Sequence, residues 1–350
     1  MTARLSLVVP GACGPLPAKL GSLDNLDQSL RALPWWTWLS RADRVAAEPD
    51  FHRQLAAVFD IQYGNAGFPY AALDLLGEAG TPQDKHWLHA DPVCLQADVD
   101  HAILFDAHSL QLTQAEADKL IAELNVHFAD DGIALFCHSP SSWYLELNQH
   151  SNIATHALHD VIGRNVNTFM PTGDDASFWK RFMNEAQMLL HMSEINQQRE
   201  ARGQLPVNSM WLWGEGQLPL AHEDEREATL DRVLTSNACA RGLAQLDGIA
   251  CEALPDSFSA LTQQLGHGRH DCVILDGLFS ATSYGDVGVW QQQFLELYEA
   301  WLSPLIYFAQ RARIPVLIYP CDGSAYQLSP SSRLRLWRRG GIKNHLRLHA

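Results

Sequence analysis

Paired histidines are the first residues in this sequence whose spacing could do chemistry. The chain has 16 histidines, and the pairs His156/His159 and His267/His270 are each followed directly by an aspartate. Residues three apart share one face of a helix, so such a pair could hold a divalent cation. Both segments are polar, and we expect them to be exposed surface without a bound ion. No metal ligand is therefore assigned from this pattern.

A second candidate is an acid/base set near residue 106. Asp106 and His108 lie two positions apart at the end of an expected strand, with His101 close by in the sequence. Side chains two apart on a strand share a face and could exchange a proton. Polar residues exposed to solvent at the end of a strand explain the same pattern, and we favour that interpretation.

A glycine pair after an apolar run is more informative. The sequence Trp213-Gly214-Glu215-Gly216 closes an expected strand over 208–213. Glycine lets another group approach the backbone closely, which suits a ligand site. The third glycine and the short strand–turn–helix spacing of a dinucleotide site are missing. The motif therefore predicts a close approach and does not identify a nucleotide.

The elements that must position these residues follow from hydrophobic periodicity. Apolar runs over 5–9, 272–275 and 316–319 predict buried strands, and helical spacing predicts helices over 51–59, 178–202, 230–246 and 290–312. Alternating strands and helices indicate a parallel sheet covered by helices, with ligands at the carboxyl ends of its strands. Residues 86–165 differ, because strand-like segments surround one helix that opens with a capping box at Thr113 and Glu116.

Composition narrows the class of protein. The 350 residues are 47% hydrophobic with a net charge of −15, which excludes global disorder and argues against nucleic acid as the main partner. Seven cysteines without a Cys-x-x-Cys pair indicate a reducing compartment. The first apolar run is too short for a signal peptide, and no stretch of 18 apolar residues predicts a membrane span. We therefore expect a cytoplasmic protein that does not act at a membrane.

The charge is unevenly spread along the chain. Six basic residues lie in the last 18 positions, with no acidic residue among them: Arg333, Arg335, Arg338, Arg339, Lys343 and Arg347. We expect this basic tail to pack on the acidic body of the protein. The alternative is an arm that recognises an anionic ligand or partner.

Several segments together resemble a known family. An Asn-x-x-Arg-x-x-x-Gly stretch, a Pro-x-Asn, the Gly-x-Gly motif and an Arg-Gly helix resemble archaeal-type cofactor-independent phosphoglycerate mutases. They occupy residues 196–203, 205–208, 213–216 and 240–248. Residues 86–93 and 208–214 resemble the bacterial RpfE-type regulatory proteins, which are distant relatives of these mutases.

The resemblance implies an α/β fold and a particular chemistry. We expect a three-layer core of alkaline-phosphatase type with a mostly parallel sheet, formed by 1–85 and 166–350, and an inserted α+β cap over 86–165. Active members of the family use two divalent metal ions, Mn²⁺ or Mg²⁺, and a Ser or Thr nucleophile. Two metal ions need a dense set of Asp and His ligands.

At the positions that match the family's ligands, this sequence departs from the pattern. Pro10 stands where an Asp should end the first strand, Ala281 and Gly285 stand for an Asp and a His, and Gly323 replaces another His. No serine occurs from 41 to 108, and Thr81 is the only threonine there. Side chains of Pro, Ala and Gly cannot ligate a metal. The sequence therefore predicts a degenerate mutase with no catalytic residue, no metal and no cofactor.

What remains is a cleft that could bind a small anionic ligand or a regulatory protein partner. We expect its lining to comprise Arg199, Asn208, Gly214, Gly216, Arg241, Asp276, Asp286 and Asp322. One alternative is an active metal-dependent mutase or phosphatase with a rearranged site. Another is a scaffold protein that docks through a tryptophan-rich surface at Trp35, Trp36 and Trp38.

Overall fold

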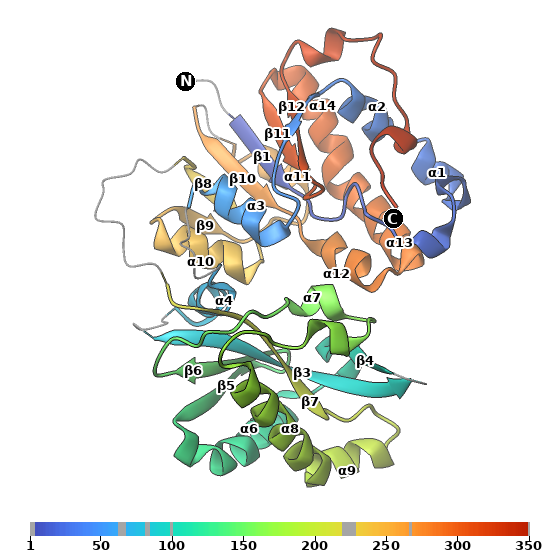
Figure 1. Cartoon of the computed structure of the whole chain (residues 1–350). Helices are drawn as coiled ribbons and strands as arrows, with labels where there is room; N and C mark the ends of the chain where they lie inside the picture. Colours follow the sequence, from blue (N-terminus) through green and yellow to red (C-terminus); the bar gives the residue numbers. More distant parts are fainter. Residues whose placement is uncertain are drawn as a thin grey trace. The chain divides into compact units, whose positions relative to one another are not determined.

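The chain folds into two compact units. The computed structural model describes residues 4–61, 68–80, 85–98, 101–218, 229–265 and 268–348. Unit 1 comprises Met1–Gln62 and Glu223–Ala350, and unit 2 comprises Tyr63–His222. Each unit has its own sheet (Figure 1). Within the described ranges, no helix has the length and apolar character needed to cross a membrane.

Unit 1 is built on a mixed, mostly parallel sheet. Its strands are β1 (Arg4–Val8), β2 (Asp43–Ala46), β8 (Arg232–Leu234), β9 (Ala250–Glu252), β10 (His270–Ile274), β11 (Val316–Tyr319) and β12 (Ser324–Leu328). Their order is β2-β12-β11-β1-β10-β8-β9. The five strands from β11 to β9 run parallel, while β12 and β2 are antiparallel. The carboxyl ends of five strands therefore meet at one edge.

Helices and short turns surround this sheet. The helices are α1 (Gln28–Arg31), α2 (Pro34–Ser40), α3 (Phe51–Val58), α10 (Ala238–Leu246), α11 (Phe258–Thr262), α12 (Gly277–Tyr284), α13 (Val287–Leu297) and α14 (Ser303–Ala312). A π-helical turn, Tyr298–Leu302, joins α13 to α14. Single 3₁₀ turns lie at Ala18–Leu20, Leu23–Asn25, Ser332–Leu334 and Ile342–Asn344. Figure 1 shows α3 and α10 beside β8, β9 and β10.

The tryptophans that could have formed a docking surface belong to the core of unit 1. Trp35, Trp36 and Trp38 are 0%, 1% and 6% exposed, and Trp36 stacks on Phe294 with ring centroids 5.4 Å apart. The helical period of α2 turns these rings onto α13 and α14, where burial of large aromatic surface stabilises the fold. The interpretation of a tryptophan-rich docking surface is therefore wrong.

Unit 2 is built on an antiparallel sheet. Its strands are β3 (His86–Asp98), β4 (His101–Phe105), β5 (Ile133–Ser139), β6 (Ser142–Leu147) and β7 (Ser209–Gly216). The path runs β4-β3-β6-β5, and β7 pairs with the long β3. The helices are α4 (Tyr70–Ala79), α5 (Ala107–Leu110), α6 (Gln114–His127), α7 (Leu158–Val161), α8 (Ala176–Met192) and α9 (Glu194–Ala201), with 3₁₀ turns at Ala129–Asp131 and Val166–Phe169.

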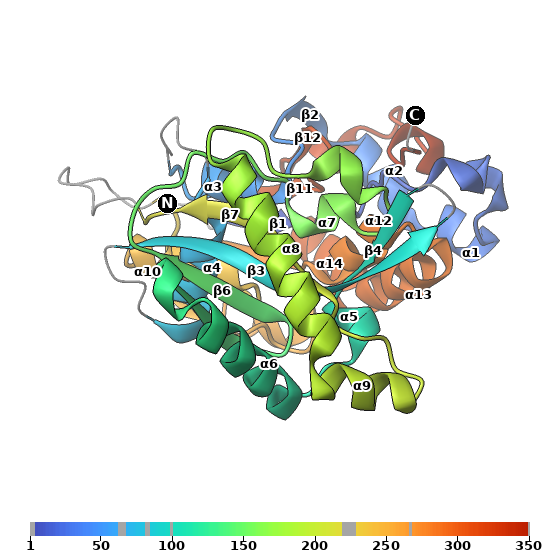
Figure 2. The ribbon, with the colours of Figure 1, turned by 60° about the horizontal axis from the view of Figure 1, so that its bottom comes forward.

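The helices of unit 2 lie on both faces of its sheet. Figure 1 shows α4 and α7 on one face and α6, α8 and α9 on the other, and Figure 2 shows α6 and α8 lying across the strands. Helix α6 begins with the expected capping box, in which Thr113 accepts from the Glu116 amide and the Glu116 carboxylate accepts from the Thr113 amide. That local prediction is confirmed.

Three predicted boundaries differ from the structure. Unit 2 is wider than the expected insertion at 86–165, because β7 pairs antiparallel with β3 and α8 packs on β7. The helix expected over 178–202 breaks at Ser193, whose hydroxyl caps α9 by accepting from the amide of Ile195. The helix expected over 230–246 begins at Ala238, since residues 232–234 form β8 between β10 and β9.

Candidate functional site

Two of the predicted site residues follow parallel strands of unit 1. Asp276 follows β10 and Asp322 follows β11, so both lie at the carboxyl ends of strands. Asp286 precedes α13 and Arg241 lies on α10. Parallel α/β sheets bind their ligands at the carboxyl edge, and a ligand site formed by these four residues stays a prediction.

Asp322 is the most deeply placed carboxylate at this edge. Its side chain is 1% exposed, and its Oδ2 lies 3.8 Å from Nη2 of Arg44 and 3.6 Å from Nε of Arg347. Its Oδ1 accepts from the amide of Ser324 at 3.0 Å. A buried charge needs an opposite charge nearby, and here two guanidinium groups of the protein supply it.

The other two aspartates are engaged at helix starts. Asp276 precedes α12 and accepts a hydrogen bond from Nδ2 of Asn237 at 2.9 Å. Asp286 caps α13 by accepting from the amide of Val289 at 3.0 Å. A carboxylate at a helix N-terminus interacts favourably with the helix dipole, and Asp286 also satisfies an otherwise unpaired amide. Asp276 makes no such capping bond to α12 and instead bonds Asn237.

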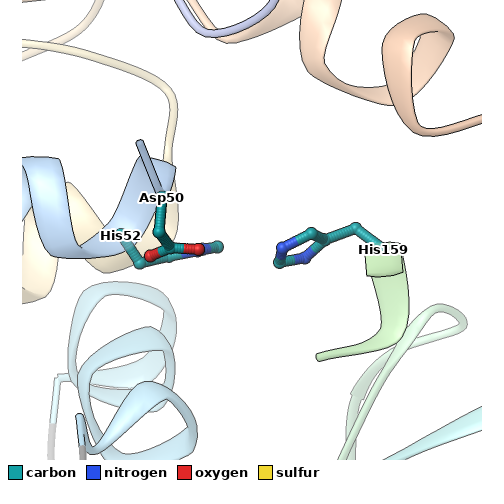
Figure 3. Close-up of side chains that lie close together, drawn as sticks. All are labelled: Asp50, His52 and His159. Carbon is teal, nitrogen blue, oxygen red and sulfur yellow. The ribbon is translucent and has the colours of Figure 1, made fainter. Parts of the chain in front are cut away.

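Asp50 and His52 form a further pair in unit 1 that the sequence analysis did not single out. Asp50 caps α3 by accepting from the amide of Arg53 at 2.8 Å, and His52 lies in the first turn (Figure 3). Their potential ligand atoms lie within 4.8 Å of each other. The spacing Asp-x-His at a helix start was visible in the sequence, but only the fold shows that the two side chains converge.

The residues that follow β1 offer no metal ligand. Pro10 and Gly11 stand there, and neither side chain can ligate a metal. Asp322 lies near the guanidinium groups of Arg44 and Arg347, whose positive charge opposes the approach of a dication.

Arg199, expected in the ligand cleft, is a structural residue of unit 2. Its side chain is 0% exposed, and its Nη1 donates to Oε2 of Glu116 at 2.9 Å. Its Nε donates to the carbonyl of Leu205 at 3.0 Å, and Nη2 donates to the carbonyl of Leu110. Arg199 therefore links α9 to the start of α6, and its fully buried side chain does not face solvent.

Asn208 also serves the fold of unit 2. Its Oδ1 accepts from the amide of Leu95 at 2.7 Å, and its Nδ2 donates to the carbonyl of Leu95 at 2.9 Å. The side chain thus continues the hydrogen-bond ladder of β3 just before β7 begins. Arg199 bonds Glu116 and two backbone carbonyls, and Asn208 bonds the backbone of Leu95, so neither contact supports the predicted place of these residues in a ligand cleft.

Gly214 and Gly216 permit a close approach, but the approaching group is α4. A Cβ on Gly214 would lie 2.8 Å from Cβ of Tyr70, and one on Gly216 would lie 2.5 Å from Cβ of Pro69. Gly214 also has φ of +71°, a region that favours glycine. The group that approaches these glycines is the start of a helix of the same unit, so this contact does not support the ligand cleft predicted here.

We expect Gly214→Ala to destabilise the protein by about 2 kcal/mol or more, from left-handed backbone strain plus the clash with Tyr70. Gly203→Ala is the matched control, because Gly203 has a similar φ of +72° with nothing within 4 Å of a built Cβ. Urea unfolding of both variants measures the difference. Equal losses for the two variants would contradict tight packing at Gly214.

A buried polar network on the α4 face of unit 2 was missed. His89 Nε2 lies 2.9 Å from Oδ2 of Asp74, and its Nδ1 lies 3.6 Å from Oδ1 of Asp91. The imidazole stacks on Trp213 at 4.3 Å, and Trp213 Nε1 donates to Oδ2 of Asp91 at 2.7 Å. Burial alone lowers the pKa of His89, but the two carboxylates outweigh it and raise the pKa to about 10. His89 is therefore an imidazolium between two aspartates.

Part of this polar network could have been predicted from the sequence. His89 and Asp91 are two apart on β3 and share one face of the strand, as side chains two apart on any strand do. Asp74 comes from α4 and could be paired with them only once the helix was placed on the sheet. Tyr144 and Glu78 extend the network through a 2.8 Å hydrogen bond.

The remaining histidine candidates have contacts of several kinds. His156 accepts from Trp211 Nε1 through its backbone carbonyl, and His159 meets the edge of the Trp213 ring. His270 bonds Ser6 through its side chain at 2.9 Å. His267, and the side chains of His101 and His108, lie outside the described residues.

The basic tail packs on acidic residues of unit 1, as expected. Arg335 makes a bidentate pair with Asp43 at 2.7 and 2.8 Å. Lys343 pairs with Asp24 at 2.8 Å, and Arg347 approaches Asp322. These contacts account for the uneven charge that the sequence shows.

Known proteins match this chain only in part. No protein-family model matches it. The chain is 25% identical over 140 residues to the 2,3-bisphosphoglycerate-independent phosphoglycerate mutase of Methanosarcina mazei, covering 38% of the chain and 34% of the relative. It is 26% identical over 181 residues to mutase 2 of Methanothermobacter thermautotrophicus, covering 51% and 45%. The chain thus spans a third to just under half of these relatives.

One solved structure shows the same fold at low sequence identity. The PH0037 protein from Pyrococcus horikoshii matches with a TM-score of 0.56 and 12% identity, covering 99% of this chain and 93% of that one. The cofactor-independent phosphoglycerate mutase from Thermoplasma acidophilum aligns with a TM-score of 0.47 and 12% identity, covering 99% and 96%. The first of these establishes the shared α/β fold. The chain is distantly similar in sequence to archaeal-type cofactor-independent phosphoglycerate mutases.

Proposed function

We propose that this protein is a mutase-like binding protein that no longer transfers phosphoryl groups through two metal ions. The observation that carries the proposal is Asp322, which is buried between the guanidinium groups of Arg44 and Arg347. A carboxylate in that position belongs to an internal ion pair, and a dication would have to displace two cations to reach it. A regulatory role agrees with the resemblance of 86–93 and 208–214 to RpfE-type proteins.

The chemistry of phosphoryl transfer supports the same conclusion. Such an enzyme needs metal ions that stabilise the attacking and leaving oxygens, and a hydroxyl nucleophile next to them. Ser40 is the last serine before the stretch 41–108, which contains none. Its hydroxyl lies 2.7 Å from Nε2 of His345 and donates to the Trp36 carbonyl. This serine belongs to the packing of α2 against the C-terminal segment.

A basic hollow in unit 1 offers a place for a small anion. Its volume is about 320 Å³, and its lining includes Arg44, Arg338, Arg339, Ser40 and His345. Burial, reinforced by Arg44, lowers the pKa of His345 to about 4, so the arginines supply the positive charge at neutral pH. Small-molecule sites of this size combine a concave surface with a few convergent polar groups. We propose a small phosphorylated or carboxylated metabolite as the ligand.

The test compares catalysis with binding of one probe, 3-phosphoglycerate. With Mn²⁺ present, we expect no conversion to 2-phosphoglycerate above background, while the Methanosarcina mazei enzyme converts it under the same conditions. Without metal, we expect 3-phosphoglycerate to raise the melting temperature of the wild-type chain in a saturable way. Arg339→Ala should lose this shift, and Arg333→Ala, a tail residue outside the hollow, should keep it.

Two outcomes would overturn the proposal. Metal-dependent conversion that disappears in Asp322→Asn or in His52→Ala would show an active enzyme, with Asp50 and His52 as part of a rearranged centre. The absence of any shift with 3-phosphoglycerate would remove the anion site and leave a protein partner as the ligand of this fold.

A further inference from the structure

Three potential metal ligands converge in unit 2. Strand register explains why they meet. His86 begins β3 and pairs with Leu147, the last residue of β6, so the loop that carries His150 starts beside it. Trp87 pairs with Gly216, which brings Glu215 of β7 next to His86. More than 60 positions separate His86 from His150, and again His150 from Glu215. The pairing of the strands brings the three residues together.

A bulge in β7 directs Glu215 toward the histidines. The register shifts between Trp87 and His89 on β3. Trp87 pairs with Gly216 and His89 pairs with Trp213, so β7 advances three positions while β3 advances two. Trp213 stacks on His89 on the α4 face, and regular alternation would place Glu215 on that face too. Gly214 takes φ of +71° at the bulge, and Glu215 reaches His86 on the other side. Bulges commonly redirect a side chain in this way next to functional sites.

The distances match those between ligands of one metal ion. Glu215 Oε1 lies 3.2 Å from Nδ1 of His86 and 3.1 Å from Nδ1 of His150. Nitrogen and oxygen ligands bind zinc at about 2.0–2.1 Å, so two ligands of a tetrahedral ion lie about 3.3 Å apart. All three ligand atoms lie within 4.8 Å of one another.

The electrostatics of this cluster favour a cation. The Glu215 side chain is 5% exposed, and a buried carboxylate needs a positive partner. The neighbouring Lys85 is paired with Glu146, and among the described ion pairs Glu215 has no lysine or arginine. Nδ1 of His86 is buried without a hydrogen bond although it faces Glu215. A metal ion would satisfy the carboxylate and the lone pair of His86 together.

Access to solvent is available on one side. The His150 side chain is 51% exposed, and the residue borders a cavity of about 490 Å³ that Ser151, Asp175 and Trp179 also line. The amide of Ser151 donates to Glu215 Oε1 at 3.4 Å and supports the carboxylate from behind. Three protein ligands with an open side are the arrangement of a zinc ion that keeps a water molecule.

We propose that His86, His150 and Glu215 bind one divalent transition-metal ion of the zinc class. Two imidazoles and one carboxylate suit zinc or cobalt better than magnesium or calcium, which prefer oxygen ligands alone. The ion would tie the start of β3, the end of β7 and the loop after β6 together.

The test uses the full-length chain after removal of metal with a chelator. We expect one equivalent of Zn²⁺ to bind in competition with a chromophoric chelator, and Co²⁺ to give a visible absorption band of tetrahedral type. His86→Ala and Glu215→Gln should each weaken Zn²⁺ binding by more than about 100-fold, since loss of an outer partner of a ligand alone costs 10–100-fold. Circular dichroism checks that both variants fold, and Glu215→Gln keeps the side-chain shape.

The controls separate this site from the other histidines. His191→Ala removes an exposed histidine on α8 of the same unit and should leave Zn²⁺ binding unchanged. Binding that survives in folded Glu215→Gln, or that disappears in His52→Ala and persists in His86→Ala, would overturn the assignment. Failure of the chain to take up Zn²⁺ or Co²⁺ would also overturn the assignment and leave Glu215 as a hydrogen-bond partner of His150 and Ser151.

Discussion

Arg199→Ala should lower the free energy of unfolding by about 3–5 kcal/mol, the usual cost of removing one partner from a buried ion pair. The substitution leaves the Glu116 carboxylate without its closest cation and deprives the Leu110 and Leu205 carbonyls of their donors. It also empties the volume of a side chain that is 0% exposed. Urea unfolding monitored by tryptophan fluorescence measures this change.

Arg202→Ala is the matched control for this experiment. Arg202 approaches the same Glu116 at 3.7 Å, but its side chain is 60% exposed, so its loss should cost less than about 1 kcal/mol. If Arg199→Ala left stability unchanged and instead weakened binding of 3-phosphoglycerate, Arg199 would be a ligand residue, as the sequence analysis expected.

The stability of the protein should decrease as the pH rises from about 6.5 to about 10, because His89 loses its proton in that interval. In the folded chain the carboxylates of Asp91 and Asp74 raise the pKa of His89 to about 10 against the opposing effect of burial. In the unfolded chain the group titrates near 6.5. The folded state therefore binds more protons throughout this window, so the stabilisation is complete below pH 6.5 and is lost toward pH 10.

The change in the free energy of unfolding with pH follows from the number of protons that the folded state holds in excess of the unfolded state. One extra proton held by the folded state corresponds to a loss of up to about 1.4 kcal/mol per pH unit. Urea unfolding between pH 6.5 and 8.5 measures it before most cysteines ionise in the unfolded chain. Histidine NMR signals report the protonation of His89 directly.

Asp91→Asn should reduce this slope and destabilise the protein at pH 7. The amide keeps an acceptor for Trp213 but removes the negative charge that contributes most to the raised pKa of His89. Asp160→Asn is the control, because Asp160 lies 3.9 Å from His159 with a side chain that is 57% exposed. A wild-type stability that stays flat from pH 7 to 8.5 would show that His89 is neutral in the fold.

Local interactions explain which elements the sequence predicted well. The capping box at Thr113 and Glu116 and the helix at 51–59 depend on residues within a turn or two of one another. The apolar runs that became β1 and β10 are buried on both faces, and such continuous runs indicate central parallel strands. In β11, buried residues alternate with half-buried ones.

Nonlocal contacts explain the errors. The short β8 is a strand because β10 and β9 flank it, although helical spacing continues through its residues. The helical pattern of apolar residues continues on both sides of Ser193, so the pattern alone does not show the break. The break appears in the structure, where the Ser193 hydroxyl caps α9. Strand β7 left the predicted parallel sheet because its partner is β3, and pairing partners are not encoded in either strand alone.

The amino-acid sequence by itself determined the α/β class and the mostly parallel sheet, and it places side chains that cannot ligate a metal at Pro10, Ala281, Gly285 and Gly323. The fold class follows from residue type and local periodicity. Tertiary structure alone decided that helix α4 approaches Gly214, that Arg199 bonds Glu116 and two carbonyls, and that Asn208 bonds the backbone of Leu95. It also decided that Asp322 lies near Arg44 and Arg347, and that His86, His150 and Glu215 meet. Those outcomes depend on strand register and on a bulge, which set the face and the neighbours of each side chain across long sequence separations.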